Sequence, residues 1–320
     1  IYTVLHTLSL HDALPILAGS DPTSAQSQPL PGNWVQEVTR SNPKYWYRFE
    51  EGDPAQPVVN SGWAGSAFNG FYGPGITADN FVPSVIVSPA GRALEFIGPP
   101  EPNTTPKYVE ILQEIPELVN FRPPTVDKVT TVEYWIKTTQ RGSHGNNAWQ
   151  SPSILARESP GDGDMYWGNI TATGDFVFST SDLHEIRTIR DRNYPVTDGR
   201  WHHVVMVKKW YRNQPCVSIL YVDGGAEEGG VTITATTPAG HPSYQDLDAG
   251  IRRIGLTDNG ELGNVQFIGI LDEVAIYDRE LTPAEVRLHY RSVSLGDTDG
   301  DGLPDAWELS YGLDPLRNDA

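Results

Sequence analysis

The chain has 320 residues, of which 38% are hydrophobic, and it contains 31 glycines and 26 prolines. This turn-rich composition favours many short strands joined by loops and argues against a helical bundle. The formal net charge of −18 argues against a nucleic-acid-binding or membrane-surface protein, because so acidic a protein repels both. The single cysteine excludes an intrachain disulfide.

The N-terminal segment 1–34 is interpreted as a leader and linker outside the folded domain. Residues 1–16, IYTVLHTLSLHDALPI, resemble the translation of a sequencing adapter, and we interpret them as an assembly artefact. A degraded or truncated signal peptide ending near LAGS is the alternative. Residues 17–34 are small and polar, which is typical of a linker. The chain has no apolar run long enough to insert into a membrane.

From residue 45 onward, short alternating runs bounded by turn signals predict roughly fourteen β-strands. The predicted strands are 45–50, 84–88, 92–97, 107–112, 130–138, 153–158, 164–170, 174–180, 184–190, 201–210, 216–223, 231–236, 252–256 and 266–278. No alternation of strands with helices occurs, which argues against parallel α/β folds.

The run 130–138, TTVEYWIKT, illustrates the alternation. Val132, Tyr134 and Ile136 point to one side, and Glu133 and Lys137 point to the other. A series of such strands predicts an all-β fold of two packed antiparallel sheets.

One short helix is predicted near the C-terminus, at 281–291, LTPAEVRLHYR. Thr282 is the N-cap, Pro283 occupies the first helical position, and Glu285 completes a capping box. Leu281 and Val286 stand at the positions of a hydrophobic staple. We expect this helix to close the sandwich.

The ordered motifs resemble a known family. YWYRFEEG, ALEFIG, TVEYWIKT, DGRWHHVVMVKK with SILYVDG, and FIGILDEVAIYDRELTPAEVRLHY follow the order of laminin G-like, concanavalin A-like jelly-roll domains. The resemblance covers residues 45–291 and assigns 35–293 to such a domain. It implies a two-sheet jelly roll of the kind found in secreted lectins, adhesion proteins and accessory modules of extracellular enzymes.

The acidic run DTDGDGLPDAWE, residues 297–308, matches the ligand spacing of an EF-hand-type loop with Gly302 at the sixth position. The predicted calcium ligands are Asp297, Asp299, Asp301, the Leu303 carbonyl, Asp305 and Glu308. Pro304 and the distance from the preceding helix distinguish the run from a standard EF-hand. It resembles the calcium repeats of thrombospondin type 3 and dockerin-like modules, which assigns 294–320 to a partial repeat. A solvated acidic linker is the alternative.

This assignment carries two expectations. Crowded carboxylates repel one another until a cation binds, so we expect residues 295–315 to be disordered without calcium. Because such repeats come in series, we also expect the chain to belong to a longer protein with further domains on the C-terminal side.

No catalytic constellation is predicted. His202 and His203 are adjacent in a strand and face opposite sides, so they cannot easily share a metal, and we interpret both as structural. Asp272 and Glu273 are expected to face opposite ways for the same reason, which leaves no carboxylate pair for glycoside hydrolysis. We therefore predict that the chain is not an enzyme.

Ligand recognition is predicted for the long loops, where exposed aromatic residues can contact a glycan or a protein. The candidate ligand-binding residues are Trp149, Tyr166, Trp167 and Tyr194. The alternative is that these aromatic side chains cap the core.

The sequence thus predicts a non-catalytic binding or adhesion module that is secreted or on the cell surface, of bacterial origin, with Ca²⁺ and a polysaccharide or extracellular protein as partners. An accessory domain of a carbohydrate-active enzyme is the runner-up, and a purely structural module is the third interpretation.

Overall fold

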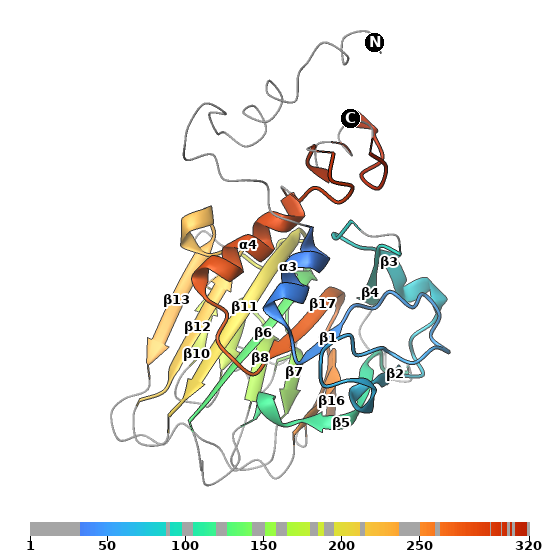
Figure 1. The fold of residues 1–320 in the computed structure, drawn as a ribbon. Helices are drawn as coiled ribbons and strands as arrows, with labels where there is room; N and C mark the ends of the chain where they lie inside the picture. The colour runs from blue at the N-terminus through green and yellow to red at the C-terminus, as the bar shows by residue number, and fades with distance from the viewer. Residues whose placement is uncertain are drawn as a thin grey trace.

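The computed structural model describes most of the chain after the N-terminal segment (Figure 1). The described residues are 33–87, 90–97, 105–119, 127–142, 151–157, 165–179, 185–188, 195–211, 215–236, 250–259, 263–294, 296–301, 303–305, 308 and 311–318. Within them the chain forms two large antiparallel sheets and two α-helices, which confirms the predicted jelly-roll sandwich.

One sheet has eight strands and contains the longest strands of the described residues. In order across the sheet they are β13 (Val231–Thr236), β12 (Val217–Val222), β11 (Trp201–Trp210), β6 (Lys128–Lys137), β17 (Gly269–Tyr277), β4 (Arg92–Phe96) and β3 (Phe81–Pro83), and β1 (Tyr45–Tyr47) also pairs with β17. Strand β11 pairs with β6 along its whole length, so this pair forms the centre of the sheet.

The second sheet has seven strands. They follow the order β10 (Glu185–Thr188), β9 (Phe176–Ser179), β8 (Met165–Ile170), β7 (Ser153–Arg157), β14 (Ile251–Ile254), β5 (Val109–Ile115) and β2 (Gly70–Tyr72). A separate two-stranded ribbon joins β15 (Leu256–Asn259) to β16 (Gly263–Gln266).

The main core lies between the two sheets and follows the predicted alternation. Val132, Tyr134 and Ile136 of β6 point into it, and Trp167 and Phe178 enter from the seven-stranded sheet. All five are fully buried, and burial of each such side chain stabilises the fold by about 1.5–3 kcal/mol.

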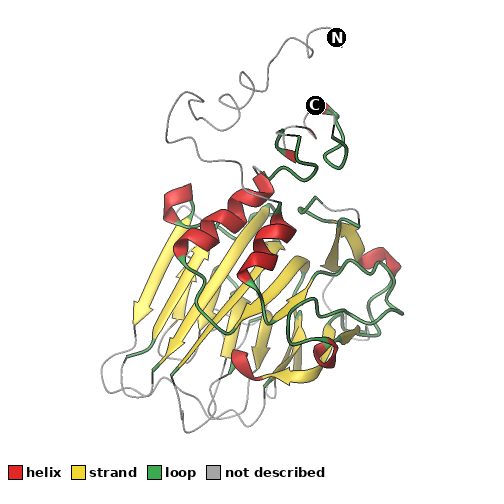
Figure 2. Cartoon of the chain, in the orientation of Figure 1, coloured by secondary structure: helices red, strands yellow, loops and turns green. Residues whose placement is uncertain are grey.

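Both helices cover the outer face of the eight-stranded sheet, where they lie side by side (Figure 2). Helix α4 (Pro283–Ser294) begins with the predicted capping box, since Glu285 N donates to Thr282 Oγ1 at 3.2 Å and Thr282 N donates to Glu285 Oε2 at 2.8 Å. Leu281 and Val286 are both buried in the cluster under the helices, as predicted. No helix of the described residues is long and apolar enough to cross a membrane.

Helix α3 (Trp34–Ser41) was not predicted. Asn33 caps it by accepting a hydrogen bond from Gln36 N at 3.0 Å. Trp34, which the sequence analysis placed in the linker, is fully buried against the outer face of the sheet. Helix α3 therefore begins one residue before the predicted boundary at residue 35.

Three strand predictions were wrong in detail. The run 84–88 contains no strand among its described residues 84–87, and the chain instead pairs β3 just before it. The run 252–256 is interrupted at Gly255, whose positive φ of 83° turns the chain from β14 into β15. The run 266–278 is likewise divided between the end of β16 and β17.

Candidate functional site

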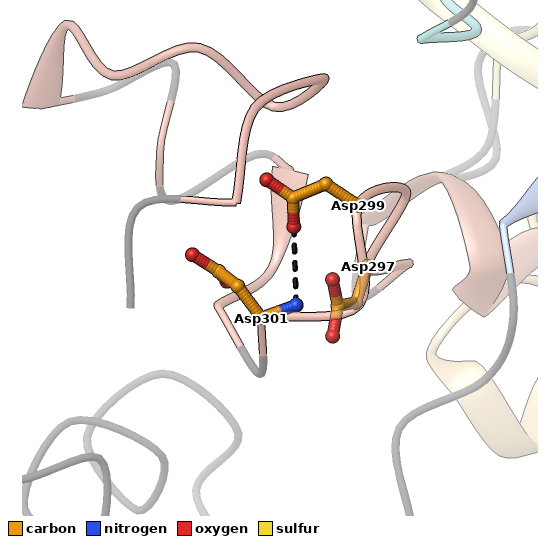
Figure 3. Close-up of side chains that lie close together, drawn as sticks. All are labelled: Asp297, Asp299 and Asp301. Carbon is orange, nitrogen blue, oxygen red and sulfur yellow. Dashed lines mark hydrogen bonds between the residues drawn. The ribbon is translucent and has the colours of Figure 1, made fainter.

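The acidic loop after α4 brings three of the predicted calcium ligands together. Asp297, Asp299 and Asp301 each offer a carboxylate oxygen, and these oxygens lie within 4.8 Å of one another (Figure 3). The loop curls because its carboxylates accept hydrogen bonds from nearby backbone groups: Asp301 N donates to Asp299 Oδ1 at 3.1 Å, and Gly300 N donates to Asp297 Oδ1 at 2.8 Å.

Two further predicted ligands, Asp305 and Glu308, lie beside this cluster. Asp305 accepts hydrogen bonds from Thr298 N at 2.7 Å and from Thr298 Oγ1 at 2.6 Å. Glu308 is fully buried, and neither of its carboxylate oxygens has a hydrogen-bond partner. A buried carboxylate without a partner is costly, and a cation beside this side chain would relieve that cost.

The electrostatics of the loop support the same conclusion. Burial, followed by repulsion from the four aspartates, raises the pKa of Glu308 to about 7. The pKa values of Asp299 and Asp305 are also raised, in each case first by burial. Closely packed carboxylates with raised pKa values are relieved by a hard divalent cation, and oxygen ligands in this number suit Ca²⁺.

The acidic loop is fixed against the sandwich where it starts. Asp305 N donates to Gly296 O at 2.8 Å, which closes the loop on its own beginning. A Cβ added to Gly296 would lie 2.0 Å from Ser292 O and 3.4 Å from the Asn33 Cα, so the chain passes between the end of α4 and the cap of α3.

The predicted carbonyl ligand, Leu303, follows Asp301 and donates its own N–H to Asp301 Oδ1 at 2.8 Å. The sixth position, Gly302, lies outside the described residues.

The predicted aromatic ligand surface is wrong for the two residues that the structure describes. Trp167 is buried in the main core and donates its Nε1–H to Leu118 O at 2.9 Å. Tyr166 is buried on the opposite face of β8 with Ala156 and Val177. Both residues belong to a strand and not to a loop end. Trp149 and Tyr194 lie outside the described residues.

The prediction that Asp272 and Glu273 face opposite ways is also wrong. A β-bulge between Asp272 and Ala275 adds a residue to β17, and Glu273 adopts a positive φ of 53°. Leu271 and Val274 both point into the main core, so the two acids between them share the outer side. The bulge thus creates a carboxylate pair that strict alternation does not reveal.

Both acids of this pair are fully buried and bound to neighbours. Glu273 accepts hydrogen bonds from Trp46 Nε1 at 2.5 Å and from Arg48 Nε at 3.0 Å, and Asp272 accepts one from the Ser84 hydroxyl. Burial raises the pKa of Glu273 to about 7 although Arg48 lowers it, and burial together with repulsion from Glu273 raises the pKa of Asp272 well above its usual value.

With the geometry described, comparison with known proteins identifies the family. A laminin G-type family model, described as the concanavalin A-like lectin/glucanases superfamily, matches residues 116–287, which is more than half of the chain. The chain belongs to this superfamily. No curated protein sequence matches it.

Solved structures show similar folds at low sequence identity. The binding domain of Paraclostridial Mosquitocidal Protein 1 is 12% identical with a TM-score of 0.49, over 78% of this chain and 52% of that one. The botulinum neurotoxin serotype D binding domain is 10% identical with a TM-score of 0.44, over 78% and 51%. Trypanosoma rangeli sialidase in complex with sialic acid is 13% identical with a TM-score of 0.45, over 80% and 34%. The chain thus spans about half of each toxin domain and a third of the sialidase.

His202 of the WHHVV motif contacts Asp223 of the LYVDG motif and so joins the two motifs. Its Nδ1 lies 2.9 Å from Asp223 Oδ2 and its Nε2 lies 3.0 Å from Asp198 Oδ1. Burial alone would lower the pKa of His202, but the hydrogen bonds to the two aspartates raise it. Asp223 also accepts a hydrogen bond from His203 N at 2.9 Å, so it ties the start of β11 to the turn that follows β12. The structural interpretation of His202 agrees with these contacts.

The sequence analysis missed a buried polar cluster under the two helices, which we name the Glu133 cluster: Ser41, Glu133, His203, Tyr277 and His289. His203 Nε2 and His289 Nδ1 each donate to Glu133 Oε1 at 2.8 Å, and Tyr277 OH donates to Glu133 Oε2 at 2.6 Å. His289 Nε2 lies 2.9 Å from Ser41 Oγ. The cluster joins β6, β11, β17, α3 and α4. Its only signal in the sequence is a glutamate on the polar side of a central strand.

Proposed function

We propose that the chain is a non-catalytic, extracellular carbohydrate-binding module whose C-terminal loop is a thrombospondin type 3-like repeat holding a structural Ca²⁺. One observation carries the calcium assignment. Glu308 is fully buried with both oxygens unpartnered, next to an aspartate cluster that repels it. The residues that would hold the ion are Asp297, Asp299, Asp301, the Leu303 carbonyl, Asp305 and Glu308.

The proposed role of the ion is structural because all of its ligands belong to one continuous run of the chain, so the ion would close the loop on itself. When bound, Ca²⁺ neutralises the repulsion between the carboxylates, and its binding energy then becomes folding energy of the loop. The loop begins between α3 and α4, so an ordered loop would fix the direction in which the chain leaves the domain. Extracellular calcium modules bind with dissociation constants of about 10⁻⁴–10⁻³ M, which suits a protein outside the cell.

A binding function is favoured over catalysis by the burial of the acids in the sandwich. Asp272 and Glu273 have no exposed surface, and their partners lie in the layer under the helices. The hydrogen-bonded series Ser41, His289 and Glu133 has the connectivity of a catalytic triad, but it lies buried between helix and sheet. A substrate cannot reach either group without displacing the side chains that bury it.

A carbohydrate ligand is proposed because the superfamily combines lectins with glucanases. The test is a glycan array with the wild-type protein in the presence and absence of calcium, beside the variant Glu308→Gln. We expect binding to a defined set of glycans, with Glu308→Gln retaining the same specificity because the ion is structural. If the protein binds no glycan on the array but binds an extracellular matrix protein, the carbohydrate proposal is contradicted and a protein ligand is favoured.

A further inference from the structure

Trp63 lies on the loop between β1 and β2 and is 53% exposed. Among the described residues it is the only tryptophan with so much exposed surface; Trp34, Trp46, Trp135 and Trp167 are all buried. Tryptophan side chains are highly buried on average, and they are enriched where proteins bind other molecules.

Backbone hydrogen bonds hold the Trp63 loop in place. Trp63 N donates to Pro43 O at 3.1 Å, and Ala64 N donates to Lys44 O at 3.0 Å. A Cβ added to Gly62 would lie 2.3 Å from Lys44 O, so the loop packs directly on the chain that enters β1. The ring is therefore presented on a fixed backbone, which reduces the entropy that a ligand must offset on binding.

Asn60 adds a side-chain brace to the same loop. Its Oδ1 accepts hydrogen bonds from Trp46 N at 2.8 Å and from Gly62 N at 3.0 Å, and its Nδ2 donates to Gly65 O at 3.0 Å. This buried side chain uses three of its hydrogen-bonding positions to shape the loop on both sides of Trp63.

Charged and polar groups surround the ring. The Lys44 ammonium lies 4.8 Å from the centre of the Trp63 ring, 2.8 Å from Glu117 Oε1 and 3.8 Å from Asp278 Oδ2. Tyr45 OH donates to Glu117 Oε2 at 2.7 Å. Asp278 is 45% exposed, so its carboxylate is available to a ligand. Lys44 thus lies over one face of the ring, and the two acids bound to Lys44 bring groups of both signs next to the apolar plane.

We propose that Trp63 is a stacking platform for a neutral pyranose residue of a polysaccharide, with Lys44 and Asp278 contacting its hydroxyl groups. The inference rests on the proposed carbohydrate-binding function and assigns a site to it. A pyranose ring has an apolar face of C–H groups and a rim of hydroxyls, which matches the plane of Trp63 and its polar edge. Asp278 is the most exposed of the three charged side chains, at 45% against 20% for Lys44 and 12% for Glu117, so an acidic sugar would meet a negative charge and is disfavoured.

A protein partner fits this surface less well. The centre of a protein interface is depleted in charged residues, whereas Trp63 has a lysine over its ring and two acids next to that lysine. The apolar area offered by one indole is small for a protein contact and well matched to one sugar ring.

The test uses cellohexaose, xylohexaose and laminarihexaose as neutral probes and hexagalacturonate as the acidic one. The indole N–H signals of ¹⁵N-tryptophan protein are followed by NMR during titration, and Trp63→Phe assigns the Trp63 signal. We expect at least one neutral probe to shift that signal, and hexagalacturonate to leave it unchanged. We also expect Trp63→Ala to weaken binding of that neutral probe by about tenfold or more.

Phe71→Ala is the matched control, because Phe71 is a 43% exposed aromatic residue on the outer side of the seven-stranded sheet. We expect it to bind the probes as the wild type does. If Phe71→Ala loses binding and Trp63→Ala retains it, the carbohydrate function stands but the Trp63 site is wrong. If no neutral probe shifts the Trp63 signal, the inference is wrong, while the glycan array still decides the proposed function separately.

Discussion

Replacing Glu133 by leucine tests whether the Glu133 cluster holds the two helices on the sheet. The side chain is fully buried and accepts hydrogen bonds from His203, His289 and Tyr277. Leucine has a similar volume but no acceptor, so three buried donors lose their partner. Removing one member of a buried charged network costs about 3–5 kcal/mol, and we expect Glu133→Leu to lower the free energy of unfolding by this amount.

The assay is equilibrium unfolding in urea, followed by tryptophan fluorescence and by circular dichroism. Glu133→Gln keeps one acceptor oxygen, and we expect it to cost about 1–2 kcal/mol. The control is Glu227→Gln on the surface, where the side chain is 73% exposed beside Arg287 and the expected change is within about 0.5 kcal/mol. If the free energy of unfolding of Glu133→Leu also lies within about 0.5 kcal/mol of the wild-type value, the Glu133 cluster does not stabilise the fold and the reasoning fails.

Three further predictions concern stability, each measured by urea unfolding. Burial alone would raise the pKa of Glu133, but its histidine partners hold it well below the usual 4.5. The contribution of Glu133 to the free energy of unfolding is therefore present above pH 4.5 and is lost as the pH falls below it. Glu133→Gln should reduce the loss of stability in acid, and an unchanged dependence on pH would contradict this role of Glu133. Gly168→Ala should cost about 2–4 kcal/mol, because φ is 97° and the new Cβ would lie 2.1 Å from Tyr134 Oη. Wild-type stability would show that β8 relaxes freely around this residue and would contradict the prediction. His202→Ala should cost about 1–3 kcal/mol by removing the brace on Asp223, and a neutral result would contradict that role.

Much of the fold could be predicted because its signals are local. Alternation in β6 separates Tyr134, which faces the main core, from Glu133, which faces the helices. The capping box of Thr282 and Glu285 marks the start of α4 within the sequence itself. Helix α3 was missed because its cap, Asn33, follows a proline-rich stretch, and because eight residues give a weak helical pattern.

The carboxylate cluster could be predicted because its residues lie in one continuous run of the chain. The aspartates of the acidic loop are spaced by the sequence, and the structure brings Asp297, Asp299 and Asp301 within reach of one ion. By contrast, the bulge at Glu273 depends on a positive φ that alternation does not show. The exposure of Trp63 likewise depends on hydrogen bonds to residues near the start of β1, which no local pattern encodes.

The most direct test of the central claim is amide hydrogen exchange of residues 295–315 in calcium and in chelator, with Glu308→Gln beside the wild type. We predict that calcium strongly protects this segment in the wild type, with half-saturation at about 10⁻⁴–10⁻³ M, and that the protection requires a higher concentration in Glu308→Gln. Equal exchange in calcium and in chelator would contradict the proposal that the acidic loop holds a structural ion.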